Sequence, residues 1–357
     1  ISKLTLIQFK NHESAEFELS PGLNTFVGQN GSGKTNILDA IYCLCYTKSF
    51  LNPVDSQLIH HAHGFYMLQG MFHKQEDPIK VSLGLKKGQK KQLKQNQKTL
   101  DRLADHIGFA PAVLIAPSDR DLIHEGSEYR RKFFDSILST YDSAYLQDLL
   151  QYQQAIKNRN ATLKQMVERR SRDASYLEVW DSQVIALSEK LIPKREVLVK
   201  EFLPLFQSLY QEISKGNETA DITWNAAISE EGLEMDLKRS VERDLKLGYT
   251  TKGLHKDDFD LSLDGQPIKK FGSQGQQKTF LLAMKLANYK LLQEKTGSTP
   301  LLLLDDIFDK LDHQRVKHLL KLIHDEEFGQ IFLTHTQKEE LEAILALEDL
   351  QAKIFSL

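Results

Sequence analysis

Apolar residues in the first third of the chain recur at the two-residue spacing of β-strands. Residues 63–73 and 79–86 alternate in this way on either side of a polar turn. Residues 23–27 follow a Pro-Gly turn and predict another strand, and residues 112–116 predict a buried one. An apolar stretch with helical spacing ends near Tyr46. The pattern predicts an α/β lobe over residues 1–120.

The middle of the chain has the three- and four-residue apolar spacing of helices. No glycine occurs between residues 127 and 215, which predicts a run of helices in an insertion over 121–250. Alternation returns at 257–263, and the apolar run 301–304 is typical of a central strand in a parallel sheet. Residues 251–357 are therefore predicted to form a second α/β lobe. The fold class that follows is α/β, with two lobes and an inserted α-helical lid domain.

A glycine-rich loop with the spacing G-x-x-x-x-G-K-[ST] lies between the strand at 23–27 and the helix after it. Its residues are Gly28, Gln29, Asn30, Gly31, Ser32, Gly33, Lys34 and Thr35, and Asn36 follows them. Glycines let backbone N–H groups turn toward phosphate oxygens, and a helix N-terminus favours negative charge. Lys34 is expected to neutralise the β- and γ-phosphates of ATP, and Thr35 to bind Mg²⁺. The alternative, an ordinary glycine turn, does not require a strand before it and a helix after it.

Two carboxylates, Asp305 and Asp306, end the apolar run 301–304. Ligands bind at the carboxyl ends of strands in parallel sheets, so both carboxylates are expected at the nucleotide. Asp305 is predicted to hold Mg²⁺ directly or through water, and Asp306 to orient or deprotonate the attacking water. The alternative is a pair of strand-end carboxylates that cap the following segment.

A second anion site is indicated where a serine and a glycine open the next predicted helix. The residues Ser273, Gln274, Gly275 and Gln276 resemble the ABC-type signature Ser-Gly-Gly-Gln. Phosphate loop, signature, Asp-Asp strand and His335 occur in the order of the ABC ATPase superfamily, and residues 309–312 resemble its D-loop. The resemblance implies a switch role for His335, and implies that Ser273 and Gly275 contact the γ-phosphate bound by a second chain. Lys10 and Asn11 stand where SMC-like ATPases carry a pair of residues near the nucleotide.

The spacing of these motifs resembles the bacterial RecF family. Ser273 follows Lys34 by 239 residues, which is longer than in transport ATPases and much shorter than in chromosome-type SMC or Rad50 ATPases. Further segments look like those of RecF proteins: 129–135 with Arg130 and Arg131, 157–160, Trp180-Asp181 and 253–258.

The resemblance to RecF implies an ABC/SMC-type ATPase head that clamps DNA when ATP drives two chains together. It implies gapped, single- and double-stranded DNA as ligands, RecR and RecO as partners, and support of RecA loading, replication restart and the SOS response. ATP acts in this scheme mainly as a dimerisation switch, with weak DNA-dependent hydrolysis. A transport-coupling ATPase subunit and a non-hydrolysing ATP-binding scaffold are the alternative functions.

The charge balance places any DNA contact in local patches. The 357 residues include 46 Lys and Arg against 49 Asp and Glu, a net charge of −3, which excludes a strongly basic chromatin-type protein. Five lysines without an intervening acid form one candidate patch: Lys86, Lys87, Lys90, Lys91 and Lys94. A solvated hairpin explains these lysines equally well. Arg130 and Arg131 form the second candidate.

The remaining features indicate a protein of a reducing compartment. Two cysteines, Cys43 and Cys45, are too few for a disulfide framework, and their apolar neighbours predict core packing. The chain contains no apolar run long enough for a membrane span, so a cytoplasmic location without membrane contact is expected. The histidines at 60, 61 and 63 are interpreted as a polar loop rather than a metal cluster.

Overall fold

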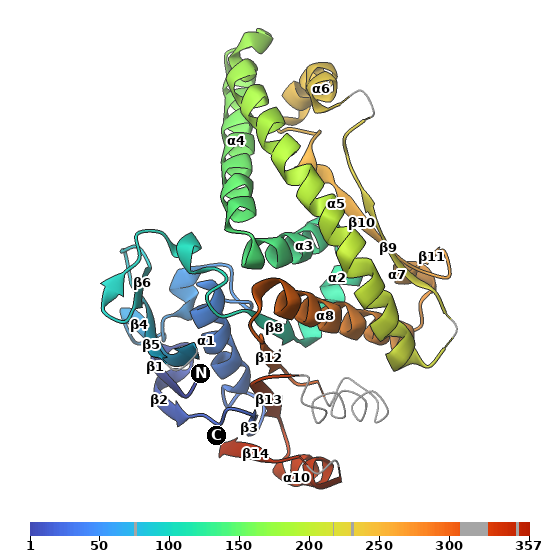
Figure 1. The fold of residues 1–357 in the computed structure, drawn as a ribbon. Helices are drawn as coiled ribbons and strands as arrows, with labels where there is room; N and C mark the ends of the chain where they lie inside the picture. The colour runs from blue at the N-terminus through green and yellow to red at the C-terminus, as the bar shows by residue number, and fades with distance from the viewer. Residues whose placement is uncertain (75–76, 217, 230–231, 308–327, 348–349) are drawn as a thin grey trace. The chain divides into compact units, whose positions relative to one another are not determined.

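The computed structural model describes residues 1–74, 77–216, 218–229, 232–307, 328–347 and 350–357 (Figure 1). These residues form two compact units. The first, called the ATPase unit below, comprises residues 1–119 and 284–357, and the second, called the helical unit, comprises residues 120–283. Residues 251–283 thus group with the helices, although the sequence places them in the C-terminal lobe. The three-part division of the chain stays a prediction.

A five-stranded parallel sheet carries the phosphate loop of the ATPase unit. Its strand order is β14-β3-β13-β12-β8, and every neighbouring pair is parallel. Strands of such a sheet are apolar along their whole length because both faces are covered. The strands are β3 (Leu23–Val27), β8 (Ala112–Ile115), β12 (Leu301–Leu304), β13 (Ile331–His335) and β14 (Ala352–Ser356).

A six-stranded antiparallel sheet forms the other layer of the ATPase unit, in the order β2-β1-β4-β5-β6-β7. Its long hairpin confirms the alternation at 63–73 and 79–86. Buried and exposed residues alternate along its strands, as expected for a sheet with one covered face. The strands are β1 (Lys3–Phe9), β2 (His12–Glu18), β4 (Phe65–Lys74), β5 (Asp77–Lys86), β6 (Gln92–Gln95) and β7 (Lys98–Thr99).

Helix α1 (Lys34–Tyr46) lies between the two sheets of the ATPase unit. It contacts β1, β4 and β5 on one side and β8 and β13 on the other. A helix covered on both sides is apolar nearly all round, and ten of its thirteen residues are buried. Cys43 and Cys45 are free and fully buried, which confirms their predicted core packing. Helix α10 (Lys338–Leu347) precedes β14.

The helical unit confirms the predicted run of helices. It holds α2 (Asp121–His124), α3 (Ser127–Tyr141), α4 (Ser143–Glu168), α5 (Glu178–Ser214), α6 (Leu233–Leu247) and α7 (Ile268–Phe271). A three-stranded antiparallel sheet in the order β11-β10-β9 accompanies them: β9 (Ala220–Asn225), β10 (Asp258–Leu263) and β11 (Gln266–Pro267). Helix α8 (Gln274–Thr296) begins in this unit and ends in the ATPase unit. Within the described part of the chain, no helix is long and apolar enough to cross a membrane.

Candidate nucleotide-binding site

The phosphate loop connects the buried strand β3 to helix α1, as its sequence predicts. Gly31 and Gly33 adopt φ values of +87° and +103°, which side-chain-bearing residues rarely adopt. A Cβ atom at Gly33 would also lie 2.5 Å from the His12 imidazole. Glycine at this position therefore serves both the turn and the close approach of the β1–β2 connection.

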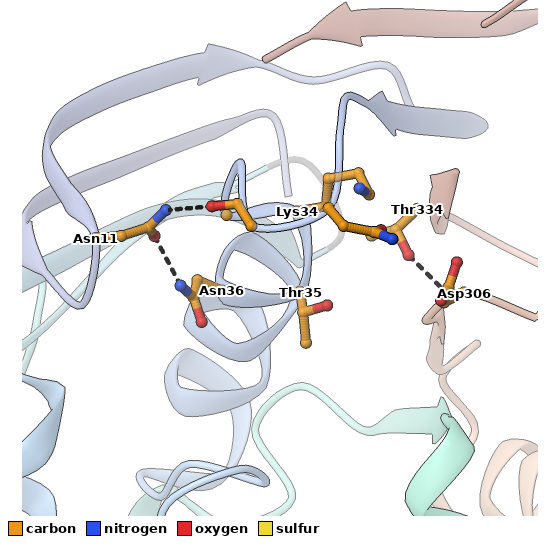
Figure 2. Close-up of a pocket in the computed structure, with 9 residues that line it drawn as sticks. Asn11, Lys34, Thr35, Asn36, Asp306 and Thr334 are labelled. Atoms are coloured by element: carbon orange, nitrogen blue, oxygen red, sulfur yellow. Dashed lines mark hydrogen bonds between the residues drawn. The ribbon is translucent and has the colours of Figure 1, made fainter. Parts of the chain in front are cut away.

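Side chains of the β1–β2 turn hold the phosphate loop from outside. Asn11 Nδ2 donates to the Gly31 carbonyl at 3.4 Å, and Asn36 Nδ2 donates to Asn11 Oδ1 at 2.7 Å (Figure 2). His12 Nε2 lies 3.1 Å from the Gly33 carbonyl, which accepts a hydrogen bond from it. Asn11 and Asn36 thus lie at the loop, and their contact with the nucleotide stays a prediction. His12 was not predicted, because nothing in a lone polar residue at the start of a strand indicates this contact.

Lys34 is buried, and its ammonium group bonds back onto the loop. Lys34 Nζ donates to the carbonyls of Gly28 at 2.6 Å and Gln29 at 3.0 Å. A buried cation with neutral partners retains a strong attraction for an incoming anion, because carbonyl dipoles do not neutralise its charge. The position of Lys34 therefore suits a phosphate bound at the loop.

Asp305 lies at the carboxyl end of β12 and accepts two hydroxyl protons. Its Oδ1 atom lies 2.9 Å from Thr35 Oγ1 and 2.9 Å from Thr334 Oγ1. Burial is the main cause that raises the pKa of Asp305, because it disfavours the charged carboxylate, and the bonds from both hydroxyls act in the opposite direction. A carboxylate and a hydroxyl at this distance are hard oxygen ligands of the kind that Mg²⁺ requires.

Asp306 follows with a left-handed backbone, at φ +50°. Its N–H donates to Thr334 Oγ1 at 2.8 Å (Figure 2). Asp306 and Thr334 lie at the edge of a cavity of about 320 Å³, whose lining consists of Asn11, Asn30, Gly31, Gly33, Lys34, Thr35, Asn36, Asp306 and Thr334. The structure therefore brings the two motifs together around one opening, although 270 residues separate Thr35 from Asp305.

Two of the predicted nucleotide residues point elsewhere. Lys10 Nζ lies 2.6 Å from Asp39 Oδ2 on α1, and both side chains are nearly inaccessible to solvent. His335 is buried at the end of β13, where Nδ1 accepts from the N–H of Gln337 and its carbonyl accepts from Gly28. Neither residue lines the cavity, so their roles at the nucleotide stay predictions.

The signature residues form the exposed N-terminus of α8 in the helical unit. The Ser273 N–H donates to Gln276 Oε1 at 2.6 Å, and the Gln276 N–H donates to Ser273 Oγ at 3.2 Å. This reciprocal pair is a capping box, which fixes where a helix begins. Ser273 and Gln274 are exposed, as a contact with a second chain requires. The predicted D-loop at 309–312 lies outside the described residues.

The chain matches known proteins over nearly all of its length. The model of the RecF/RecN/SMC N terminal domain matches residues 1–353. The DNA replication and repair protein RecF of Flavobacterium johnsoniae is 44% identical over 357 residues, which cover 100% of this chain and 99% of that protein. The chain belongs to the RecF family. RecF of Phocaeicola vulgatus is also 44% identical, over 100% of this chain and 96% of that protein.

Solved structures agree with this assignment. A structure of the recombination mediator protein RecF-ATPrS in the RecFOR pathway has a TM-score of 0.89 and 30% identity, and covers 100% of this chain and 95% of that one. An Smc head domain from Pyrococcus furiosus has a TM-score of 0.56 at 19% identity, over 99% of this chain and 92% of that one, and shows a shared fold. The ABC/SMC-type head predicted from the sequence is thus confirmed.

The segments that resemble RecF proteins build the buried ionic core of the helical unit. Arg159 lies between Asp181 Oδ1 at 2.5 Å and Asp244 Oδ2 at 2.6 Å, and is fully buried. In the same unit, Arg195 pairs with Asp135 and with Asp257 at 2.9 and 2.8 Å. The RecF-type segments thus supply Arg159, Asp181, Asp135 and Asp257 to these pairs. Together with Arg195 and Asp244, the pairs connect α3, α4, α5 and α6.

Arg130 and Arg131, which were predicted to contact DNA, are engaged within the helical unit. Arg130 forms a two-bond pair with Asp258, at 2.7 and 3.0 Å. Arg131 Nη1 donates to Ser127 Oγ and to the Asp257 carbonyl, both at 2.6 Å. Both guanidinium groups thus have intramolecular partners, and their contact with DNA stays a prediction that the geometry does not favour.

The lysines of the β5–β6 hairpin divide into two kinds. Lys86, Lys87, Lys90 and Lys94 are exposed. Lys91 Nζ lies 2.5 Å from Asp55 Oδ1, and its side chain is 8% exposed. Within this patch, only the four exposed lysines are accessible enough to contact the phosphate backbone of DNA.

Proposed function

We propose that this RecF-family protein binds ATP and Mg²⁺ in the cavity at Lys34 and uses the bound nucleotide to hold DNA. The observation that carries the proposal is the meeting of Lys34, Thr35 and Asp306 around one cavity, with Asp305 hydrogen-bonded to Thr35. The family relatives are DNA replication and repair proteins, and one matching solved structure is of RecF-ATP, at 31% identity. In this proposal the loop N–H groups and Lys34 bind the phosphates.

Magnesium is expected between Thr35 and Asp305. The Thr35 hydroxyl donates to the Asp305 carboxylate at 2.9 Å, and both groups would serve as Mg²⁺ ligands. The ion would supply charge neutralisation at the β- and γ-phosphates. Asp306, held at the edge of the cavity, would orient the attacking water, and the expected hydrolysis is slow.

ATP is proposed to act mainly as a switch between the monomer and a dimer of this chain. The exposed N-terminus of α8, with Ser273 and Gly275, would contact the γ-phosphate held by a second chain. Binding free energy of ATP would then favour the dimer. His335 would sense the same phosphate, and Lys10 with Asn11 would support the nucleotide from the β1–β2 turn.

The four exposed hairpin lysines are proposed to contact the phosphates of DNA. Such contacts do not depend on the base sequence. The matching RecF structures belong to the RecFOR pathway. We therefore propose gapped DNA as the substrate and RecO and RecR as partners. Support of RecA loading, replication restart and the SOS response, and a cytoplasmic location, belong to the same proposal.

A mixing experiment tests the switch. Lys34→Met removes the ammonium that binds phosphate but keeps the signature, and Ser273→Arg blocks the signature but keeps the phosphate loop. Each variant alone is expected to remain monomeric with ATP in sedimentation velocity. Their mixture can form one intact composite site, so we expect ATP-dependent dimers in the mixture. A mixture that stays monomeric while the wild type dimerises would refute contact between the signature and the nucleotide of a second chain.

A charge-reversal experiment tests the DNA surface. Replacing Lys86, Lys90 and Lys94 with Glu should weaken DNA binding and reduce the salt dependence of the affinity by about three counterions. The control reverses three exposed lysines of the helical unit, Lys164, Lys190 and Lys200. An equal loss of affinity in both variants would indicate a general charge effect and refute the hairpin surface.

A further inference from the structure

Thr334 bonds to both aspartates of the candidate site through a single hydroxyl, to the Asp305 carboxylate and to the Asp306 backbone N–H. It is the fourth residue of β13, and only 1% of its surface is exposed. The parallel register pairs Leu333 with Leu304, so the next residues, Thr334 and Asp305, lie side by side. Thr334 Oγ1 donates to Asp305 Oδ1 at 2.9 Å and accepts from the Asp306 N–H at 2.8 Å.

The two bonds of Thr334 have a fixed direction. A threonine hydroxyl has one proton, and an N–H group can only donate, so the proton is committed to Asp305 and a lone pair to Asp306. The carboxylate oxygen that Thr334 holds is the same Oδ1 that accepts from Thr35. The orientation of Asp305 toward Thr35 therefore depends on a hydroxyl from the neighbouring strand.

The backbone of Asp306 needs this support. A φ of +50° is uncommon for a residue with a side chain and persists where the surroundings hold it. The Asp305 N–H still pairs with Ile115 of β8 at 2.9 Å, so the regular ladder reaches Asp305. At Asp306 the N–H bonds to the Thr334 side chain instead. The chain turns at this change of partner, and Asp306 lines the cavity (Figure 2).

We infer that Thr334 is a positioning residue that aligns Asp305 for Mg²⁺ and directs Asp306 toward the nucleotide. This inference rests on the proposed function, because it assigns Thr334 to the same site. A purely structural role, in which Thr334 only satisfies buried polar groups, predicts equal effects on ATP binding with and without Mg²⁺. The positioning role predicts an effect only where the carboxylates act.

The test replaces the hydroxyl and keeps the shape. Thr334→Val should bind ATP in EDTA within about twofold of the wild type. The gain in ATP affinity on adding Mg²⁺, and any DNA-dependent hydrolysis, should fall 10- to 100-fold, as is typical when a group that orients a metal ligand is lost. Thr334→Ser retains the hydroxyl and should restore both. The affinity measurement decides by itself if hydrolysis is too slow to measure.

Thr25 offers a matched control in the same sheet. It is fully buried in β3, and its hydroxyl has no hydrogen-bond partner among the described residues. Thr25→Val should therefore leave the Mg²⁺-dependent gain unchanged. The inference is overturned if Thr334→Val retains that gain, or if Thr334→Ser loses as much as Thr334→Val. A wild-type chain that does not bind ATP would instead overturn the proposed function and this inference with it.

Discussion

The nucleotide site of the ATPase unit and the core of the helical unit bury charged side chains in opposite ways. In the ATPase unit, Lys34 bonds to loop carbonyls, and Asp305 accepts protons from two hydroxyls. In the helical unit, Arg159 is held between the carboxylates of Asp181 and Asp244. The first arrangement leaves charge to be neutralised by a ligand, and the second neutralises charge within the fold.

This difference indicates which buried charges stabilise the fold and which are available to bind a ligand. A buried charge that is paired with the opposite charge gains little from a ligand, and loss of its partner is strongly destabilising. A buried charge with neutral partners contributes less to the fold and more to binding. The RecF-type segments of the helical unit are therefore expected to affect stability, and the phosphate loop and Asp305 of the ATPase unit to affect nucleotide binding.

The largest effect is expected from Arg159→Met. Removing the guanidinium leaves the buried Asp244 and the partly buried Asp181 without a counter-ion, so the free energy of unfolding should fall by about 3–5 kcal/mol. Urea unfolding followed by circular dichroism measures this change. Arg169→Met, at an exposed position after α4, is the control and should shift stability by less than about 0.5 kcal/mol. Similar effects of the two variants would remove the distinction between the units.

Acid should destabilise the helical unit through His255. Its Nε2 donates to the Thr250 carbonyl at 3.0 Å, and Nδ1 accepts from the Tyr152 hydroxyl at 2.9 Å. The pKa of His255 is lowered to about 4, and burial is the largest cause of this shift. The folded chain then binds this proton less readily than the unfolded chain. The contribution of neutral His255 to the free energy of unfolding is fully present above the ordinary histidine pKa of about 6.5. This contribution, about 3 kcal/mol, is lost as the pH falls toward 4.

Denaturant unfolding between pH 4 and 7 measures this acid sensitivity. His255→Gln should flatten the dependence over that range, whereas His61→Gln, at an exposed position, should leave it unchanged. An unaltered slope in His255→Gln would show that another group carries the acid sensitivity.

The smallest effects separate neighbouring lysines of the β5–β6 hairpin. Lys91→Ala breaks the partly buried pair with Asp55 and should cost about 1 kcal/mol of stability. Lys90→Ala should leave stability within about 0.5 kcal/mol and weaken DNA binding instead, since Lys90 is exposed. Thermal melts and DNA titrations at two salt concentrations measure both quantities. The reverse assignment, in which Lys91→Ala alone weakens DNA binding, would refute the division of this patch.

Local patterns were sufficient to predict the elements that carry the nucleotide motifs. Strand β3, the phosphate loop and α1 are consecutive, so their spacing alone predicted them. The apolar run at β12 likewise predicted a strand inside a parallel sheet. Contacts that depend on the register between strands were not predictable. Thr334 reaches Asp305 only through the register of β12 and β13, which a single sequence does not specify.

The basic residues show the same limit. Arg130 was interpreted as a surface residue because its partner, Asp258, lies 128 residues away in the chain. Lys91 was grouped with its neighbours for the same reason, since Asp55 belongs to an earlier turn. A cluster of charges in a sequence indicates a patch only if tertiary pairing does not use them, and that pairing is a property of the fold.

The most direct test of this account is ATP binding by Lys34→Met, measured by calorimetry with Mg²⁺ beside the melting temperature of the same variant. Lys34 bonds to neutral carbonyls, so its removal should weaken ATP binding at least tenfold. The melting temperature without nucleotide should change little. Wild-type affinity for ATP in this variant, or unfolding of the variant comparable to Arg159→Met, would contradict the assignment of the buried charge at Lys34 to the nucleotide.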